Sequence, residues 1–580
     1  MNIKEIFKRI LDNNVEIFLK NDNIGVKKTD GKISNEILQL IKNNKKYIVE
    51  YLKLFPNINE MIFHRDENSE IIPSFSQERL SIFQNTIPNH SRSMNTVLSV
   101  NIIGDLKIDI LKKCIEKIVL KHNVLRSNFI YDNELKVKIK SKISIDHIFD
   151  YYDCCEKGTD FLNDIIEEKT KKPFNLANDD LIRVLLVRNK IDNYDLYVTI
   201  SNLVTDGWSA QIFFKELNVA YNNLLDDNVY ELDDNVIDYW DYSSFIRNKD
   251  YLTLDKKEID YWKNHLSDID NEIVFINKIE NRAEKSYIGK KKKFFFSEKI
   301  LQKMKELSQK NQSTIFVQML TYIQLMLLRN TYNRNFAMYV PIINRNNTVL
   351  QNIIGLFDNL FIFKADTEGV LTINQQLNKN KNIIYDAFEN QSVPFEVILC
   401  QLKKIPKFQI QVSMLDKSMK NLELSECDVT NNDYDLGTCM CDIEIYFWES
   451  EDGIEGHFQY STDLFDESMI ENLISDMYSI VETHLDYEDV KLSDILKGEG
   501  DNEGAVLNIK KRIVTLIEEI LESSNIYLNK TIPENGIHSL SMYILSRKLK
   551  DMYNVNIDQI DMYNISVNKL IDYISDKEKV

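Results

Sequence analysis

The sequence predicts an α+β protein of several domains, on three observations. The chain has 580 residues, enough for about three or four domains with large cores. Its composition is 43% hydrophobic and 28% charged, which is typical of globular rather than disordered chains. Segments with the period of a strand and segments with the period of a helix follow one another along the chain.

The first 54 residues predict a compact unit of a helix, a two-stranded hairpin and two further helices. Hydrophobic residues alternate over 15–20, as in a strand, and Asn21-Asp22-Asn23 predicts the turn. Ser34 is suited to cap the next helix. A two-stranded sheet leaves an edge exposed, and such edges bind extended peptides by strand addition. Residues from about 54 to 72, with Pro56 and many charges, are predicted to be a linker.

A polar loop between a strand and a helix lies near residue 200. Residues 196–200 have the alternation of a half-buried strand, and Asp206-Gly207 predicts a turn because glycine tolerates backbone angles that other residues avoid. A helix with one hydrophobic face follows, made of Phe213, Leu217, Ala220 and Tyr221. The strand end therefore carries Ser201, Asn202 and Thr205, although this pattern alone is more typical of scaffold than of a site.

The segment SNLVTDGWS, residues 201–209, resembles the core motif of the condensation domains of nonribosomal peptide synthetases, His-His-x-x-x-Asp-Gly. Asp206, Gly207 and Ser209 match this motif, but Ser201 and Asn202 replace the two histidines. Heterocyclisation domains carry a related motif, Asp-x-x-x-x-Asp-x-x-Ser. Asp206 and Ser209 fit it and Ser201 does not, so that match is poor.

Further segments resemble motifs of the same family, in the family's order, over roughly residues 73–485. They are SFSQERLSIFQ (74–84), KHNVLRSNF (121–129), PFNLANDDLIR (173–183), DYWDYSSFI (238–246), YWKNHL (261–266), PIINRN (341–346), IGLFDN (354–359), NQSVPFEVI (390–398) and PKFQIQV (406–412). The resemblance implies a fold similar to chloramphenicol acetyltransferase with two lobes, 73–245 and 246–490. It also implies a tunnel between the lobes that admits one carrier-tethered substrate from each side.

The same resemblance assigns the site residues. Asn202 takes the place of the histidine beside the attacking amine, and Ser201 replaces the histidine before it. Asp206 and Gly207 belong to the frame, in which the aspartate pairs with a distant arginine, and Arg345 is the candidate partner. A buried carboxylate that lost this cation would cost about 3–5 kcal/mol.

Loss of the histidine weakens the case for catalysis without closing it. Asn202 can accept a hydrogen bond but cannot take a proton near neutral pH, and general-base assistance is worth about 10²–10⁴ in rate. However, an α-amine with a pKa of about 7.7–8.0 is partly neutral already, and holding two tethered reactants together can supply effective molarities of about 10⁵ M or more. Two hypotheses stay open: an amide-forming condensation enzyme (an acyltransferase), or a catalytically silent domain that docks partners and presents a carrier.

Residues 506–577 predict a last, helical domain after the acidic, glycine-containing linker GEGDNEGA. Ile513, Leu516, Ile517 and Ile520 outline its first helix. The element Gly-Ile-His-Ser-Leu resembles the Gly-Gly-His-Ser-Leu motif of peptidyl carrier proteins, which are four-helix domains, and Ile537 replaces its second glycine. The resemblance implies that Ser539, at a helix start, carries 4′-phosphopantetheine; the alternative is a simple helix-capping serine.

These resemblances also imply the partners. The N-terminal unit, 1–54, resembles TubC-type docking domains, which bind the C-terminal tail of an upstream synthetase subunit; Lys27 and Lys28 suit an acidic tail, or simply lie at a solvated strand end. Because we find no segment like an adenylation or thioesterase domain, we expect an adenylation enzyme in trans, a phosphopantetheinyl transferase, and a downstream synthetase or releasing enzyme. The protein would act in antibiotic or other secondary metabolism.

Charge, cysteines and histidines add further expectations. The net charge of −19 argues against nucleic acid or an anionic membrane as partner. Seven scattered cysteines fit a reducing cytosol, Cys439-x-Cys441 is more typical of a strand than of a metal site, and no metal is expected. We find neither a signal-peptide core nor a run of 18 hydrophobic residues, which predicts a cytoplasmic protein. Of the histidines, His122 is predicted to be framework, and the following are predicted to be surface or packed residues: His90, His147, His265, His457 and His484.

Overall fold

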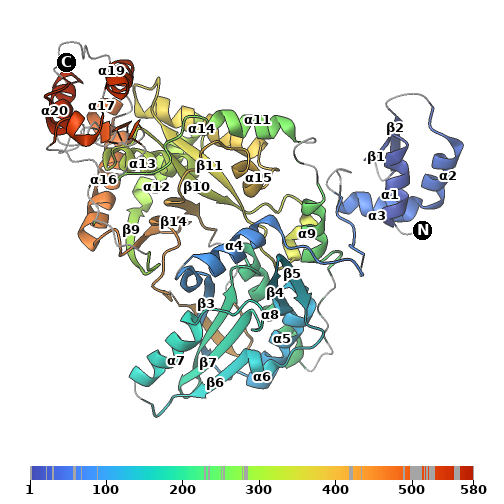
Figure 1. Cartoon of the computed structure of the whole chain (residues 1–580). Helices are drawn as coiled ribbons and strands as arrows, with labels where there is room; N and C mark the ends of the chain where they lie inside the picture. Colours follow the sequence, from blue (N-terminus) through green and yellow to red (C-terminus); the bar gives the residue numbers. More distant parts are fainter. Residues whose placement is uncertain are drawn as a thin grey trace.

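The structure is a computed structural model and describes most of the chain, with two lobes, a smaller N-terminal unit and a C-terminal helical unit (Figure 1). The described residues are 3–578 except 21–22, 29–31, 56–60, 67, 88, 158, 227–229, 231, 233–234, 250, 252–254, 277–278, 280–284, 417–421, 433, 488–489, 497–512, 515, 518–519, 522–529, 538 and 554–561.

The N-terminal unit has the predicted order of elements: α1 (Ile3–Asp12), β1 (Val15–Lys20), β2 (Asn23–Lys28), α2 (Asn35–Asn43) and α3 (Lys45–Leu54). The two strands are antiparallel, with Ile17 opposite Val26. The Ser34 hydroxyl caps α2 as predicted, because it accepts a hydrogen bond from the Ile37 N–H at 3.3 Å. Lys27 is exposed on β2, and Lys28 is half-buried at its end.

Part of the stretch predicted as a linker is packed. Phe63 stacks on Tyr51 with ring centroids 5.3 Å apart, which joins it to the N-terminal unit. The next residues contact the first lobe: the Arg65 N–H donates to Asp241 at 2.8 Å, and a His64 ring nitrogen lies 2.9 Å from the same carboxylate. The connection is therefore held at both ends.

The first lobe is built on a five-stranded sheet in the order β13-β3-β8-β7-β6. Its strands are β3 (Asn95–Gly104), β6 (Phe149–Asp153), β7 (Ile182–Lys190), β8 (Asn193–Ser201) and β13 (Cys427–Asn431), and a separate hairpin consists of β4 (Ser127–Asp132) and β5 (Glu134–Ile139). Its helices include α4 (Phe75–Thr86), η2 (His90–Ser93), α5 (Ile108–Lys121), η3 (Asn123–Arg126), α6 (Ile145–Ile148), α7 (Thr159–Lys171), α8 (Gly207–Leu225) and α9 (Tyr239–Arg247).

The prediction that β8 is buried on one face only is wrong. Tyr197 and Thr199, which alternate with the hydrophobic residues, are also buried. β8 is the middle strand of its sheet, and its two faces belong to different cores. One face packs with α5 and α8, and Tyr197 on the other face packs with Ile165 and Ile166 of α7.

The second lobe contains a six-stranded sheet in the order β11-β10-β12-β14-β15-β9. Its strands are β9 (Gly289–Ser297), β10 (Asn335–Ile342), β11 (Asn359–Asp366), β12 (Ile410–Met414), β14 (Ile443–Ser450) and β15 (Gly453–Ser461). Its helices include α11 (Lys256–His265), α12 (Glu298–Asn311), α13 (Ile315–Arg329), η4 (Thr348–Asn352), α14 (Ile373–Glu389), α15 (Phe395–Leu399), α16 (Glu467–Asp486) and α17 (Leu492–Ile495).

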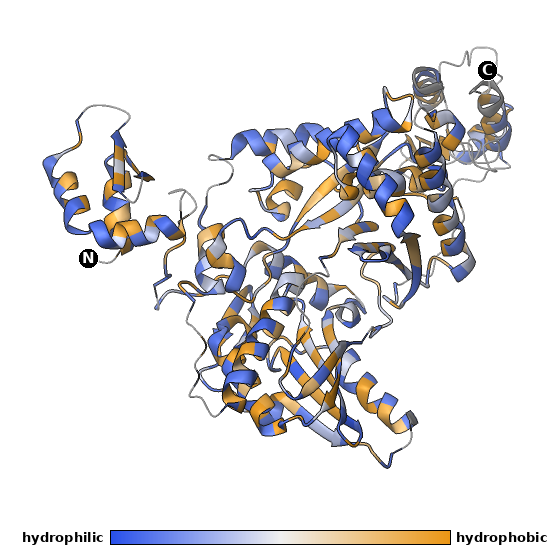
Figure 2. Ribbon diagram, turned by 180° about the vertical axis from the view of Figure 1, so that it is seen from behind, coloured by the Kyte–Doolittle hydropathy of each residue, from blue (hydrophilic) through white to orange (hydrophobic). Residues whose placement is uncertain are grey.

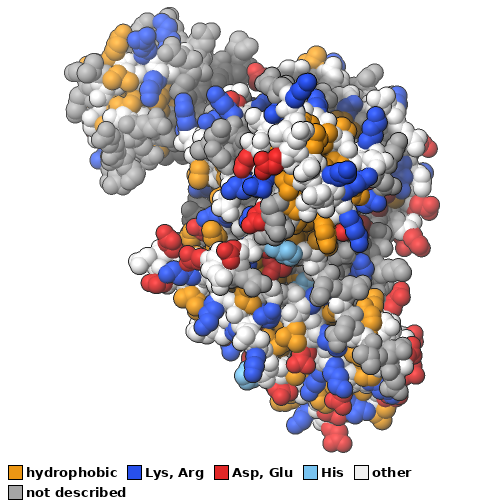
Figure 3. Space-filling view, turned by 90° about the vertical axis from the view of Figure 1, so that its right-hand side faces the viewer, with side chains coloured by type: hydrophobic (Ala, Val, Ile, Leu, Met, Phe, Trp, Pro, Cys, Tyr) orange, Lys and Arg blue, Asp and Glu red, His pale blue; other side chains and the backbone are white. Residues whose placement is uncertain are grey.

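The distribution of residue types follows this architecture. Figure 2 shows hydrophobic residues concentrated on the strands and on one side of many helices. On the face drawn in Figure 3, basic and acidic side chains lie intermingled, with hydrophobic side chains between them. That face therefore presents both signs of charge side by side, although the chain as a whole is acidic.

A single boundary near residue 245 does not separate the two sheets. Residue 245 falls within α9, whose aromatic residues belong to the first core, whereas Tyr251 belongs to the second. β13 comes from the second half of the chain but pairs with β3, with Val429 opposite Ile102. The two lobes are therefore tied together by an exchanged strand, which a contiguous 246–490 lobe does not include.

The C-terminal unit has a core of its own, which includes Ile513, Leu516 and Ile517 as predicted. Its regular elements in the described residues include η5 (Pro533–Asn535), α19 (Ser539–Tyr553) and α20 (Val567–Glu578). Ser539 is the first residue of α19, but its side chain and the whole of His538 lie outside the described residues. Among the described helices, none is long and apolar enough to cross a membrane.

Candidate functional site

The loop between β8 and α8 holds the degenerate motif. β8 ends at Ser201, and α8 begins at Gly207. Asp206 is the N-cap of α8, where its carboxylate accepts a hydrogen bond from the Ser209 N–H at 2.7 Å. An aspartate at this position satisfies a helix N–H that would otherwise lack a partner, and it suits the positive end of the helix dipole.

Arg345 lies against Asp206, as the sequence resemblance implied. One guanidinium nitrogen lies 3.0 Å and 2.9 Å from the two carboxylate oxygens, and both side chains are almost fully excluded from solvent. The other terminal nitrogen donates to the backbone carbonyls of Leu350 and Ile353, the latter at 2.7 Å. The pair joins the start of α8 in the first lobe to the loop after β10 in the second.

Neighbouring groups complete this lock, which we define as Asp206, Ser209 and Arg345 with the backbone of residues 355–357. The Ser209 hydroxyl lies 2.6 Å from Asp206 and 3.0 Å from Arg345, and the Gly355 N–H donates to it at 3.0 Å. The Phe357 N–H donates to Asp206 at 3.0 Å, and its ring lies 4.0 Å from the guanidinium. The Asp206 carboxylate and the two terminal nitrogens of Arg345 are therefore hydrogen-bonded to protein groups, whereas the buried Arg345 Nε has no partner among the described residues.

A glycine is required at position 355 by close packing. A Cβ atom built there would lie 2.0 Å from the Tyr239 ring. Tyr239 is fixed in turn, because its hydroxyl lies 3.0 Å from the Ser74 hydroxyl and donates to the Leu356 carbonyl at 2.8 Å. The segment IGLF thus brings the second lobe close to α9 and to the start of α4.

Asn202 is held by the adjacent strand β3 and the turn before it. Its side-chain oxygen accepts a hydrogen bond from the Thr96 hydroxyl at 2.6 Å, and its backbone N–H donates to the Met94 carbonyl at 2.9 Å. Its amide nitrogen lies 3.5 Å from the Ser93 carbonyl. The residue is half-buried, so these contacts fix the side chain at the strand end and leave it partly exposed.

Ser201 faces the protein core. It is 1% exposed, and its hydroxyl accepts a long hydrogen bond, 3.4 Å, from the Leu203 N–H. Of the predicted residues, the structure therefore brings Asp206 and Arg345 together and leaves Ser201 and Asn202 in separate contacts. Gly207 opens α8, and a Cβ atom added there would meet no other group within 4 Å.

His122 belongs to the framework, in keeping with the prediction. One ring nitrogen accepts from the Ile354 N–H at 3.3 Å, which leaves the other to donate to Glu216 at 2.9 Å. Lys121 also contacts Glu216 at 2.6 Å. Burial alone would raise the pKa of Glu216, but the hydrogen bonds from His122 and Lys121, together with the charge of Lys121, outweigh it and lower the pKa.

His90 was expected to be an ordinary residue, and the structure places it in η2, the turn that contacts Asn202. It is buried, its Nδ1 atom has no hydrogen bond to any described residue, and its ring packs edge-on against Tyr287 with ring centroids 4.9 Å apart. Burial, with the nearby charges of Lys285 and Arg79, lowers the pKa of His90 to about 4. The turn beside Asn202 therefore carries a neutral, weakly basic imidazole, which the sequence pattern did not indicate.

Cys439 and Cys441 lie buried just before β14, outside the strand that was predicted for them, because β14 begins only at Ile443. Their sulfur atoms lie 3.2 Å from the carbonyls of Cys441 and Ile443, and burial raises the pKa of both thiols. Within the described part of the chain, no group of three or more His, Cys, Asp or Glu side chains is arranged to hold a metal ion.

Comparison with known proteins identifies the central region. The family model for the condensation domain matches residues 67–499. A linear gramicidin synthase polypeptide of Brevibacillus parabrevis is 26% identical over 420 residues, which cover 70% of this chain and 8% of that protein. The dimodular nonribosomal peptide synthase of Bacillus subtilis (strain 168) is 25% identical over 442 residues, which cover 72% of this chain and 18% of that protein. The chain thus spans less than a fifth of either relative.

Solved structures share the two-lobed fold. The X-domain in its complex with OxyB, from teicoplanin biosynthesis, gives a TM-score of 0.68 at 18% identity, over 75% of this chain and 96% of that one. The four-domain nonribosomal peptide synthetase holo-AB3403, bound to AMP and glycine, gives a TM-score of 0.66 at 16% identity. The match covers 81% of this chain and 40% of that one. The chain belongs to the condensation domain family, and the relatives that it matches include nonribosomal peptide synthetases.

Proposed function

We propose that this chain is a subunit of a nonribosomal peptide synthetase that takes part in amide bond formation between carrier-bound substrates. The observation that carries this proposal is the intact lock of Asp206, Ser209 and Arg345 behind a motif that has lost both histidines. The lock joins the two lobes by buried, charge-assisted hydrogen bonds, which are costly to maintain unless the relative position of the lobes matters.

In the proposed reaction, the amine on one carrier attacks the thioester carbonyl on the other. A C–N bond forms, the C–S bond breaks, and the sulfur leaves as a thiolate that takes up the proton lost by the amine. Asn202 positions the amine as a hydrogen-bond acceptor and removes no proton. Proximity in the cleft then supplies most of the rate enhancement, with effective molarities that reach about 10⁵ M or more in well-oriented systems.

A second candidate function is that of a catalytically silent scaffold that docks partners for the carrier. It is favoured by the Thr96 hydroxyl, which already occupies the Asn202 oxygen at 2.6 Å and fixes the amide within the protein. A structural relative, the X-domain from teicoplanin biosynthesis, was solved as a complex with OxyB, which supports a docking role for this fold.

Supplying both loaded carriers and measuring the condensed product by mass spectrometry separates the two candidates. The condensation proposal expects product with the unaltered chain and a faster rate with Asn202→His, because an imidazole adds a base worth about 10²–10⁴ in rate. Asn202→Ala is the matched control and should be slower than the unaltered chain. Absence of product from the unaltered chain and from Asn202→His would instead support the scaffold.

We infer further that the C-terminal unit is a peptidyl carrier whose Ser539 bears 4′-phosphopantetheine. Its position as the first residue of a 15-residue helix supports this, since helix N-terminal amides favour a phosphate. The group would supply a thiol for thioester attachment of cargo. The partners that we propose are a phosphopantetheinyl transferase, an adenylation enzyme in trans and a downstream synthetase or releasing enzyme. Intact mass after treatment with a promiscuous transferase and coenzyme A should rise, and Ser539→Ala should abolish the rise; an unmodified chain would overturn the inference.

The N-terminal unit is proposed to bind, by strand addition to β2, the C-terminal tail of an upstream synthetase subunit. The exposure of β2 and of Lys27 supports an acidic tail as its partner. Replacing Lys27 and Lys28 together by glutamate should weaken this association at least severalfold, with a steep dependence on salt. An unchanged affinity would contradict the proposal.

A further inference from the structure

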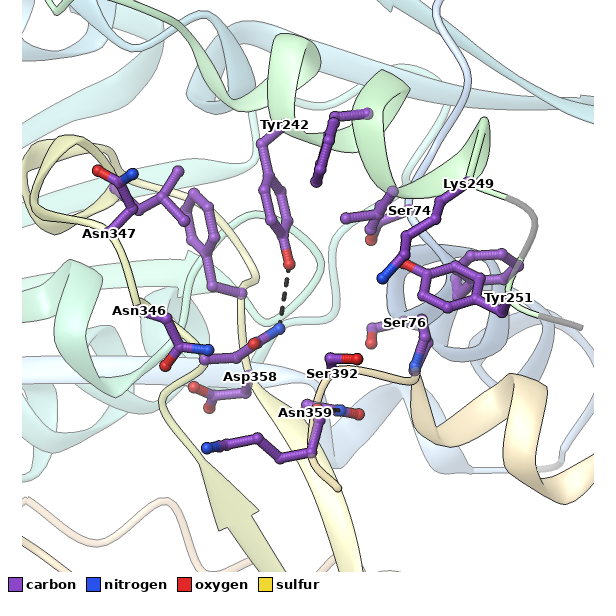
Figure 4. A pocket seen from close by; sticks show the side chains of 18 of the residues that line it. Ser74, Ser76, Tyr242, Lys249, Tyr251, Asn346, Asn347, Asp358, Asn359 and Ser392 are labelled. Carbon is purple, nitrogen blue, oxygen red and sulfur yellow. Dashed lines mark hydrogen bonds between the residues drawn. The ribbon is translucent and has the colours of Figure 1, made fainter. Parts of the chain in front are cut away.

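A second interior feature lies beside the lock: a pocket of about 480 Å³. It is bounded by the start of α4, by the second half of α9 and by the loops around residues 344–350, 356–359 and 389–394. Figure 4 shows Asp358, Asn346 and Asn347 on one side of this pocket and Lys249, Tyr251 and Ser76 across from them. Neither Ser201 nor Asn202 lines it, so the pocket is distinct from the strand end discussed above.

Asp358 is the unusual group in this pocket. It directly follows Phe357, whose N–H is bound to Asp206, and it directly precedes β11. Its carboxylate is partly exposed, and among the described residues it has no hydrogen bond or ion pair. Asp206, which contacts the residue before it, is in contrast fully paired.

The other charged groups of the pocket are either satisfied or lie at its rim. Lys249, the cation among the described lining residues, is paired with Asp255 at 2.8 Å. Glu258 accepts the Ser392 hydroxyl at 2.8 Å. Glu389 is exposed. Since this one paired cation faces four carboxyl groups, the described lining of the pocket has an excess of negative charge and does not suit an anion.

Burial, reinforced by the charge of Asp206 and opposed by that of Arg345, raises the pKa of Asp358 well above its ordinary value. The ionised form of a carboxyl that has no protein partner is poorly stabilised in such a place. A cation bound beside it would stabilise that form. Aromatic side chains around it, including Phe75, Tyr242 and Phe357, favour a cation attached to an apolar body.

We propose that this pocket binds a primary ammonium group on an aliphatic chain, with the Asp358 carboxylate as its counter-ion. The assignment of that ammonium to carrier-tethered cargo rests on the proposed function, whereas the site itself does not. An aminoacyl chain with a basic end would place its ammonium here, and a free alkylamine carries the same chemistry. A divalent metal fits less well, because Asp255 and Glu258 are already engaged and no metal-binding group is found in the described residues.

The test uses the full chain and two matched pairs of probes in calorimetric titrations. The first pair is n-hexylamine and 1-hexanol, which differ in the ammonium and are independent of any carrier. The second pair is the stable pantetheine amides of 6-aminohexanoate and hexanoate. We expect at least tenfold tighter binding of the amine of each pair, and proton release on amine binding in weakly acidic buffers of different ionisation enthalpy.

Asp358→Asn keeps the shape of the side chain and should abolish both the preference for the amine and the proton release. Glu389→Gln, which removes an exposed carboxyl from the rim, is the matched control and should keep both. A preference seen with n-hexylamine alone supports the site and assigns it to free amines. A preference unchanged by Asp358→Asn, or no preference in either pair, overturns the proposal.

Discussion

Replacing Arg345 by alanine tests the lock most directly. The change removes two contacts to the Asp206 carboxylate, at 3.0 and 2.9 Å, one to the Ser209 hydroxyl at 3.0 Å, and the donors to two backbone carbonyls. Asp206 keeps its bonds from the Ser209 N–H and the Phe357 N–H but stays buried without its counter-charge. Breaking a buried pair in this way costs about 3–5 kcal/mol.

The expected signal is a lower melting temperature of the condensation domain in differential scanning calorimetry. With an unfolding entropy of about 2.1 cal/mol/K per residue, a cooperative unit of about 430 residues loses roughly 3–6 °C for that energy. The double variant Asp206→Asn with Arg345→Met removes both charges and should be closer to the unaltered protein than Arg345→Ala is. A soluble Arg345→Ala protein with an unchanged melting temperature would refute the reasoning.

Two further variants follow from the framework. Glu216→Gln should lower the melting temperature near pH 7, because the pKa of Glu216 is lowered in the folded state. The stabilisation from the ionised carboxylate is fully present above the unfolded pKa of about 4.3 and is lost as the pH falls through the folded pKa. The difference in melting temperature between the two proteins should therefore shrink towards about pH 3. A difference independent of pH would contradict this origin. Gly355→Ala should lower the free energy of unfolding by about 1–3 kcal/mol, since its Cβ would meet the Tyr239 ring. Combining it with Tyr239→Leu should recover part of this loss. A Gly355→Ala protein with unchanged stability would show that the ring moves freely.

Local patterns were sufficient for the elements themselves. The helix, hairpin and two helices of residues 1–54 follow from alternation, turn residues and the Ser34 cap, which act within a few residues of one another. The start of α19 at Ser539 also agrees with the sequence prediction. Asp206 and Gly207, predicted to form a turn, are instead the N-cap and the first residue of α8, because the Asp206 carboxylate accepts the Ser209 N–H and starts the helix there. The loss of the two histidines is a fact of the sequence that no fold can change.

Contacts between distant segments required the structure. Periodicity describes how one segment alternates, but it does not say what covers each face, so the second buried face of β8 was missed. The strand β13 leaves the second lobe to pair with β3, which no contiguous division of the chain could express. The pairing of Asp206 with Arg345, in contrast, was anticipated through the resemblance to the family.

The sequence by itself determined the order of elements in residues 1–54, the family motif and the absence of an imidazole at residues 201 and 202, because these depend on residue types and short spacings. The tertiary structure decided which polar groups are satisfied. Asp206 and Asp358 are the same residue type near the same loop, yet one has a full set of partners and the other has none among the described residues. That difference arises from which groups of remote segments fold against each carboxylate, and it sets the charge and the binding chemistry of the interior.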